Sequence, residues 1–271
     1  MNNQSPIGIF DSGVGGLTVM RKLIQVMPEE NVVYFGDTAR VPYGNKSQDI
    51  IIHYTRQITH FLQNQNVKAI VVACNTASAY ALETIQREFD LPIIGVIEPG
   101  AKAAAAATRN GKIGIIGTYA TISTGAYERF LNQIDPVFEI STKACPLFVP
   151  FVEEGLIDSI LTDGIIAYYL ENLKYAEIDT LLLGCTHYPL LKSSIERFMG
   201  SQVTCVDPAL NTAESLRSIL KEKSLLNSLE QGQNPQYDFF VSDSAARMTE
   251  FANRIMPFSI DKIKNINIET F

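Results

Sequence analysis

The ten residues AIVVACNTAS, positions 69–78, bring an apolar run to an abrupt end at a cysteine followed by polar and small residues. A short apolar run rich in β-branched residues predicts a buried strand, here Ala69–Cys74. Apolar side chains at helical spacing follow and predict a helix over Ala77–Phe89. A buried strand that leads directly into a helix is the building unit of α/β folds with parallel sheets.

The same alternation of short apolar runs and longer amphipathic segments continues along the whole chain. Further strands are predicted at Ile7–Asp11, Val32–Gly36, Ile93–Val96, Ile113–Gly117, Val137–Ser141, Thr180–Cys185, Val203–Val206 and Asp238–Val241. Further helices are predicted at Leu17–Val26, Gln48–Gln63, Gly125–Asn132, Ile157–Leu173, Leu190–Phe198, Thr212–Lys223 and Ala245–Ile255. This pattern predicts an α/β fold whose strands are mostly parallel.

A weak internal repeat relates two parts of this pattern. The segment VVACNT at 71–76 resembles LLGCTH at 182–187, because each is an apolar strand that ends in cysteine and two polar residues. Likewise, IGIFDS at 7–12 resembles IGIIGT at 113–118. Repeats of this kind indicate related structural units. We therefore expect two related α/β lobes, each of which presents one cysteine at the carboxyl end of a strand.

The repeat also suggests where the lobes begin and end. The second lobe is expected to span residues 98–207. The strand near Phe239 and its neighbouring helices have no counterpart there, so we assign them to the first lobe. That lobe is therefore predicted to be discontinuous and to comprise residues 1–97 and 208–271.

Composition excludes several classes of function. The 271 residues carry a formal net charge of −7 with no cluster of Lys and Arg, which argues against a nucleic-acid partner. No apolar stretch reaches the roughly 18–20 residues of a membrane span, and no secretory signal is recognisable, so a cytoplasmic location is expected. Four cysteines without CxxC spacing and only three histidines argue against a metal site.

Cys74 and Cys185 both lie at the carboxyl end of a predicted strand, just before a predicted helix. Ligands of open α/β sheets bind at this edge. A helix N-terminus lowers the pKa of a nearby thiol, because its N–H groups stabilise an anion. One thiolate could remove a proton from a carbon while a thiol on the opposite face returns one, which inverts a stereocentre without any cofactor. Cys145 and Cys205 are interpreted as structural.

Three ionisable side chains are candidates to assist the two cysteines. Asp11 ends the first predicted strand and could contact a thiol or a substrate amine. His187 lies two residues after Cys185 and could assist its proton transfer. Glu153, in the sequence PFVEEG, is predicted at the start of a helix and could reach the same site.

The carboxylates of a free amino acid also need binding groups. Hydroxyl, amide and N-terminal helix N–H groups are expected at Ser12, Asn75, Thr76, Thr186 and His187, and a Pro-Tyr-Gly loop would add N–H donors at Tyr43 and Gly44. The same Ser, Thr and Asn residues also serve as helix N-caps.

Four of these stretches carry a family resemblance. They are GIFDSGVGGLTV at 8–19, YFGDTARVPYG at 34–44, ACNTASA at 73–79 and LGCTHYPLL at 183–191. At these residues the sequence resembles the glutamate racemase branch of the aspartate/glutamate racemase superfamily, and looser similarity extends from Pro6 to Met256.

The resemblance implies two pseudosymmetric lobes, each a mostly parallel sheet flanked by helices, with the active site between them. It also implies cofactor-independent racemisation of L-glutamate to D-glutamate for peptidoglycan synthesis. It implies no pyridoxal phosphate, no metal and a homodimer. By motif, Cys74 and Cys185 would be the catalytic thiols, assisted by Asp11, His187 and Glu153. Substrate contacts would be made by Asp11, Ser12, Tyr43, Gly44, Asn75, Thr76, Thr186 and His187.

Three alternatives remain open from the residues themselves. The glycines of GVGG at 13–16 could indicate a nicotinamide-dependent oxidoreductase, but position 18 is Thr where the dinucleotide motif G-x-G-x-x-G requires glycine. A two-lobed amino-acid-binding protein would not need paired thiols. A racemase that acts on aspartate would use the same chemistry, and only the family resemblance favours glutamate.

Overall fold

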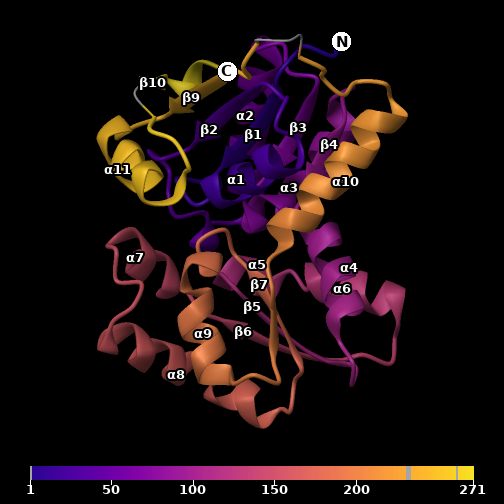
Figure 1. Ribbon diagram of the computed structural model, residues 1–271, viewed down its shortest axis with the longest axis vertical. Helices are drawn as coiled ribbons and strands as arrows, with labels where there is room; N and C mark the ends of the chain where they lie inside the picture. The colour runs from indigo at the N-terminus through magenta and orange to yellow at the C-terminus, as the bar shows by residue number, and fades with distance from the viewer. Residues whose placement is uncertain (1, 230–232, 261) are drawn as a thin grey trace. The chain divides into compact units, whose positions relative to one another are not determined.

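The structure is a computed structural model that describes residues 2–229, 233–260 and 262–271. The chain forms two compact units. The first comprises Met1–Val96 and Ala209–Phe271, and the second comprises Ile97–Pro208. In each unit, helices flank a parallel sheet (Figure 1), so the predicted α/β architecture with two lobes is confirmed.

The first unit is built on a six-stranded sheet in the order β10-β9-β2-β1-β3-β4, in which every pairing is parallel. Its strands are β1 (Ile7–Asp11), β2 (Val32–Gly36), β3 (Ala69–Val72), β4 (Ile93–Gly95), β9 (Tyr237–Val241) and β10 (Ile263–Asn265). The first three strands are buried along their whole length, which explains why they are continuous apolar runs.

Helices cover both faces of this sheet. They are α1 (Leu17–Val26), α2 (Gln48–Asn64), α3 (Asn75–Glu88), α10 (Pro208–Glu222) and α11 (Ala245–Ile255), with 3-10 turns η1 (Tyr43–Asn45) and η3 (Ile268–Thr270). The core formed with α2 and α3 contains Phe10 and Val72, together with Ile58 and Phe61 of α2. The alternation of side chains along β1 therefore divides its apolar residues between two helix layers.

The second unit has a four-stranded parallel sheet in the order β6-β5-β7-β8. Its strands are β5 (Lys112–Gly117), β6 (Glu139–Ala144), β7 (Thr180–Gly184) and β8 (Thr204–Val206). Its helices are α4 (Ile97–Ala107), α5 (Tyr119–Ser123), α6 (Ala126–Ile134), α7 (Phe148–Glu153), α8 (Ile160–Tyr175) and α9 (Lys192–Met199), with the 3-10 turn η2 (Tyr188–Leu191).

The strand orders make the pseudosymmetry of the two units explicit. The run β2-β1-β3-β4 of the first sheet has the same connectivity as β6-β5-β7-β8 of the second. This correspondence equates β1 with β5 and β3 with β7, which are the strands that the sequence repeat pairs. Cys74 and Cys185 therefore follow equivalent strands.

Some local predictions were wrong. The strand predicted at 137–141 is β6, Glu139–Ala144, because pairing with Lys112 of β5 sets its register while its own partly exposed residues show no clear pattern. The helix predicted from Leu190 begins only at Lys192, after the 3-10 turn η2. Glu153, expected at a helix start, is the last residue of α7. None of the described helices combines the length and apolar character needed to cross a membrane.

Candidate functional site

Asp11 and Cys74 are brought together at the carboxyl edge of the first sheet. Asp11 is the last residue of β1, and β1 lies beside β3 with Phe10 paired to Val72. The Ala73 N–H donates to the Phe10 carbonyl at 2.9 Å, which extends this alignment one residue beyond β3. The two polar side chains therefore follow neighbouring strands, as ligand-binding residues of parallel sheets do.

Cys74 occupies the N-cap position of α3, the 14-residue helix that follows β3. Its backbone is extended, with φ −66° and ψ 119°, and the residue is 5% exposed. Asn75 and Thr76 form the first turn of α3 and are also buried. The backbone N–H groups and the dipole at the start of a helix favour an anion there, so the position suits a thiolate.

The loop after β1 wraps closely around the Asp11 side chain. Asp11 is fully buried, and its Oδ2 accepts a hydrogen bond from the Gly13 N–H at 3.0 Å. A Cβ at Gly16 would lie 2.5 Å from the Asp11 Cβ, so only glycine fits there. Close packing against Asp11 therefore explains why this residue is glycine, and no dinucleotide-binding role is needed to explain it. Ser12 is partly buried in the same loop.

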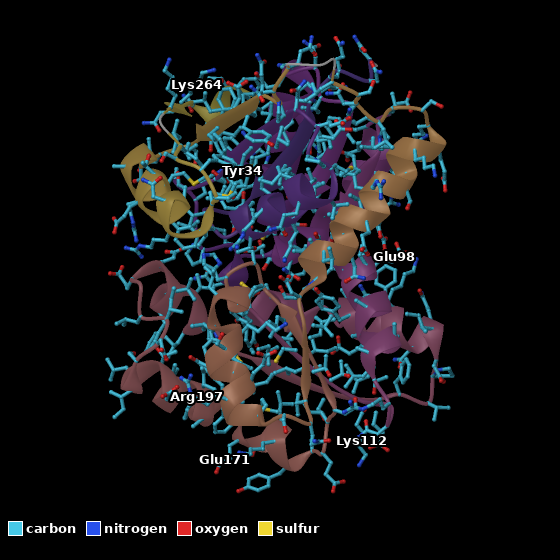
Figure 2. The ribbon with its side chains drawn as sticks, in the orientation of Figure 1. Tyr34, Glu98, Lys112, Glu171, Arg197 and Lys264 are labelled. Atoms are coloured by element: carbon cyan, nitrogen blue, oxygen red, sulfur yellow. The ribbon has the colours of Figure 1, made fainter. Side chains whose placement is uncertain are left out.

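Tyr34, for which no site role was predicted, is fully buried in the first unit (labelled in Figure 2). Its hydroxyl donates to the Gly13 carbonyl at 3.0 Å. Burial raises the pKa of Tyr34 well above its usual value, and the negative charges of Asp11 and Cys74 raise it further. Tyr34 therefore remains a protonated donor that holds the loop beside Asp11.

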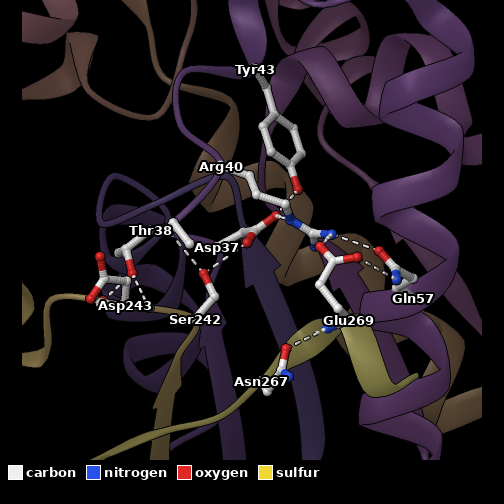
Figure 3. Close-up of polar contacts among 10 residues, drawn as sticks. Asp37, Thr38, Arg40, Tyr43, Gln57, Ser242, Asp243, Asn267 and Glu269 are labelled. Carbon is white, nitrogen blue, oxygen red and sulfur yellow. Dashed lines mark hydrogen bonds and ion pairs between the residues drawn. The ribbon is translucent and has the colours of Figure 1, made fainter.

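Tyr43 and Gly44 lie in η1, a short turn that follows β2. Tyr43 is buried, and its hydroxyl donates to Asp37 Oδ2 (Figure 3). Burial, followed by the negative charge of Asp37, raises the pKa of Tyr43 well above its usual value. Because the Tyr43 hydroxyl is bonded within the protein, we expect Tyr43 and Gly44 to offer a ligand their backbone N–H groups.

In the second unit, Cys185 heads a chain of three polar side chains. Its Sγ lies 3.8 Å from His187 Nδ1, and His187 Nε2 lies 3.1 Å from Glu153 Oε1. A carboxylate only accepts hydrogen bonds, so Glu153 favours the tautomer with the proton on Nε2. His187 Nδ1 is then left as an acceptor that faces the Cys185 thiol.

Glu153 reaches His187 from the last residue of α7, 34 residues earlier in the chain. The Glu153 side chain is partly exposed, whereas His187 is almost fully buried. Thr186 is buried and places its Oγ1 3.4 Å from His187 Nδ1. The structure therefore brings together all four predicted site residues of the second unit.

Thr118 had no predicted site role, although the internal repeat aligns it with Ser12. Thr118 follows β5, the neighbour of β7, and caps α5 by accepting a hydrogen bond from the Thr121 N–H at 3.2 Å. The two threonine hydroxyls lie 2.9 Å apart. Thr118 and Thr121 therefore place hydroxyl groups at the same sheet edge as Cys185.

Cys145 and Cys205 differ from the two strand-end cysteines. Burial raises the pKa of the Cys145 thiol far above its usual value, although the positive charge of Lys143 opposes the shift. Burial likewise raises the pKa of Cys205 to about 12. Both therefore remain neutral thiols near pH 7, consistent with their interpretation as structural residues.

Possible metal ligands are dispersed. Within residues 2–229, 233–260 and 262–271, no three His, Cys, Asp or Glu side chains gather as metal ligands would.

Comparison with known proteins agrees with this geometry. The Asp/Glu/hydantoin racemase family matches residues 7–216, which is most of the chain. This chain belongs to that racemase family. Members of the family are isomerases, and this chain is therefore an enzyme of that class.

Relatives within the racemase family match over nearly their whole length. A glutamate racemase of Geobacter metallireducens is 47% identical over 263 residues, which cover 97% of each chain. A solved glutamate racemase isoform of Bacillus anthracis is 39% identical, with a TM-score of 0.93 over 98% of each chain. The structure of Francisella tularensis glutamate racemase in complex with D-glutamate is 35% identical, with a TM-score of 0.92 over 99% of this chain and 100% of that one.

Proposed function

We propose that this chain interconverts L- and D-glutamate without a cofactor, using Cys74 and Cys185 on opposite faces of the substrate Cα. The observation that carries the proposal is that equivalent strands of the two units are followed by buried cysteines, each beside a group that can activate it. For Cys74 that group is the start of α3, and for Cys185 it is His187.

The reaction needs one thiolate and one thiol. The thiolate takes the Cα proton, and the electron pair of the C–H bond moves into the adjacent carboxylate. The second cysteine then gives its own proton to the opposite face of Cα and becomes a thiolate. The product has inverted configuration, and the two cysteines have exchanged protonation states, so the reverse reaction starts from the state that the forward reaction leaves.

His187 assists Cys185 by exchanging a proton with its sulfur. With the proton on Nε2 and Glu153 as its acceptor, Nδ1 can accept the thiol proton. Glu153 stabilises the resulting imidazolium by its negative charge. In the first unit Asp11 is the candidate partner for the substrate amine, since it is a carboxylate on the strand next to Cys74.

The substrate carboxylates would be bound by hydroxyl, amide and backbone N–H groups. We assign this role to Ser12, Tyr43, Gly44, Asn75, Thr76, Thr186 and His187. Tyr43 would contribute its backbone, because its hydroxyl is bonded to Asp37.

Glutamate is favoured as the substrate because the Geobacter relative is named a glutamate racemase and the Francisella structure contains D-glutamate. We also propose that the D-glutamate serves peptidoglycan synthesis, as the family resemblance implies, and that the enzyme acts in the cytoplasm, as expected from its sequence. We further propose that the chain acts as a homodimer, as the family resemblance implies.

An exchange experiment tests this function. Purified protein, treated with EDTA and given no pyridoxal phosphate, is incubated with L-glutamate in D₂O. We expect the Cα–H signal to disappear from the proton NMR spectrum while circular dichroism falls to zero. Exchange with aspartate but not glutamate would keep the mechanism and correct the substrate. Absence of exchange with both would contradict the proposal.

A further inference from the structure

The segment from Asp37 to Lys46 carries Tyr43 and Gly44, and its shape depends on a buried arginine. The Arg40 side chain is only 9% exposed although it belongs to a surface loop. Its Nε donates to Asp37 Oδ2 at 2.7 Å, and its guanidinium carbon lies 3.9 Å from the centre of the Tyr54 ring. Arg40 and Tyr43 thus share the same carboxylate oxygen, so the loop closes on itself around Asp37 (Figure 3).

The outer side of Arg40 is held by the C-terminal end of the chain. Its Nη1 donates to Gln57 Oε1 at 2.6 Å and to Glu269 Oε1 at 3.0 Å (Figure 3). Glu269 lies in η3, where its N–H donates to Asn267 Oδ1 at 3.1 Å. The neighbouring Ile268 is buried in the core with α2 and α3, which anchors η3.

A contribution to folding stability does not by itself explain the burial of Arg40. Within the described chain, Nη2 of Arg40 is buried and has no hydrogen-bond partner, which is unfavourable for a guanidinium. Its C-terminal partner Glu269 is 59% exposed, and ion pairs with such exposure contribute little to folding stability. A buried arginine held in this way is better explained by the precise placement of the loop that it supports.

We propose that Arg40 and Glu269 are positioning residues, through which the C-terminal turn η3 sets the Tyr43–Gly44 segment for substrate binding. This inference rests on the proposed function, since it assigns Tyr43 and Gly44 to the substrate. Displacement of a binding group by about 1 Å can weaken a reaction many-fold even when the fold is intact.

The test compares two C-terminal carboxylates that each form one ion pair. Glu269→Gln removes the charge that holds Arg40, whereas Asp238→Asn breaks the exposed pair of Asp238 with Lys264, 3.1 Å apart, which has no bond to the loop. We expect Glu269→Gln to raise KM for glutamate about 5- to 10-fold with kcat changed less than about 2-fold. Arg40→Lys, which keeps the charge but loses the planar fork, should change KM further in the same direction.

A second readout does not depend on catalysis. Hydrogen–deuterium exchange of peptides covering residues 38–46 should be at least about 3-fold faster in Glu269→Gln and unchanged in Asp238→Asn, with Tm of both variants within about 2 °C of the wild type. If the wild type does not racemise glutamate, the proposed function fails, and the exchange data alone decide the role of Arg40. Unchanged KM and unchanged exchange in Glu269→Gln, or equal changes in both variants, would overturn the proposal.

Discussion

Cys74 and Cys185 follow equivalent strands of the two units, but the chain continues differently after each of them. Cys74 caps a 14-residue α-helix, whereas Cys185 is followed by a 3-10 turn, with α9 starting only at Lys192. The first thiol therefore lies at the start of an α-helix, whereas the second lies 3.8 Å from His187 Nδ1, and His187 in turn contacts Glu153. In the proposed mechanism, the two copies of this supersecondary unit would therefore stabilise a thiolate by different means.

The largest expected effect comes from removing either sulfur. Cys74→Ser and Cys185→Ser should each lower racemisation at least about 10³-fold, because serine is a far weaker acid than cysteine. Deuterium incorporation measured separately from L- and D-glutamate should be lost mainly for one enantiomer in one variant and for the other enantiomer in the second. Cys205→Ser is the control and should remain active. Equal loss for both enantiomers in both variants would contradict separate roles for the two cysteines.

The next largest effect is a difference in alkylation rate between the proposed catalytic cysteines, Cys74 and Cys185, and the other two cysteines. With a pKa of about 12, Cys205 is ionised in roughly one molecule in 10⁴ at pH 8, and the pKa of Cys145 is also strongly raised. Iodoacetamide should therefore label Cys74 and Cys185 at least about 100-fold faster, as followed by peptide mass spectrometry. Full activity after complete alkylation of Cys74 and Cys185 would contradict the mechanism.

Glu153→Gln should impair proton transfer at Cys185 more than at Cys74. We expect racemisation to fall about 10- to 100-fold, since the variant no longer stabilises an imidazolium at His187. Exchange of the enantiomer deprotonated by Cys185 should fall more than that of the other. Glu171→Gln, an exposed carboxylate on α8, is the matched control and should leave both rates unchanged. Equal effects on the two enantiomers would show that Glu153 does not act through Cys185.

The smallest effect concerns the residue before each cysteine, which is Ala73 in the first unit and Gly184 in the second. A Cβ at Gly184 would lie 2.6 Å from the Ile116 carbonyl oxygen, so Gly184→Ala should lower the free energy of unfolding by roughly 2–3 kcal/mol. Gly164→Ala on α8 has open space and should raise it by up to about 1 kcal/mol. Urea unfolding followed by circular dichroism measures both. A neutral Gly184→Ala would show that β5 and β7 can separate at this end.

Much of the fold could be predicted because long apolar runs and helical periodicity are local signals. The bounds predicted for β1, β2, α1 and α11 are those of the structure. The short helices α5 and α7 and the strand β10 were not predicted, since segments of three to six residues depend on the surfaces they pack against. The candidate site divides in the same way: residues at the strand ends could be proposed from the sequence, whereas the links among Asp37, Arg40 and Glu269 could not.

The sequence by itself determined the α/β class, the repeat of strand and cysteine, and the residues that end each strand. These features depend on which neighbouring residues are buried, and the spacing of apolar residues along the sequence reveals that burial directly. Only the tertiary structure decided that Glu153 contacts His187 and that Glu269 contacts Arg40. It also decided that the hydroxyls of Tyr34 and Tyr43 donate hydrogen bonds to groups inside the protein. Such contacts join residues far apart in the chain, and their geometry exists only once loops have closed and side chains have packed.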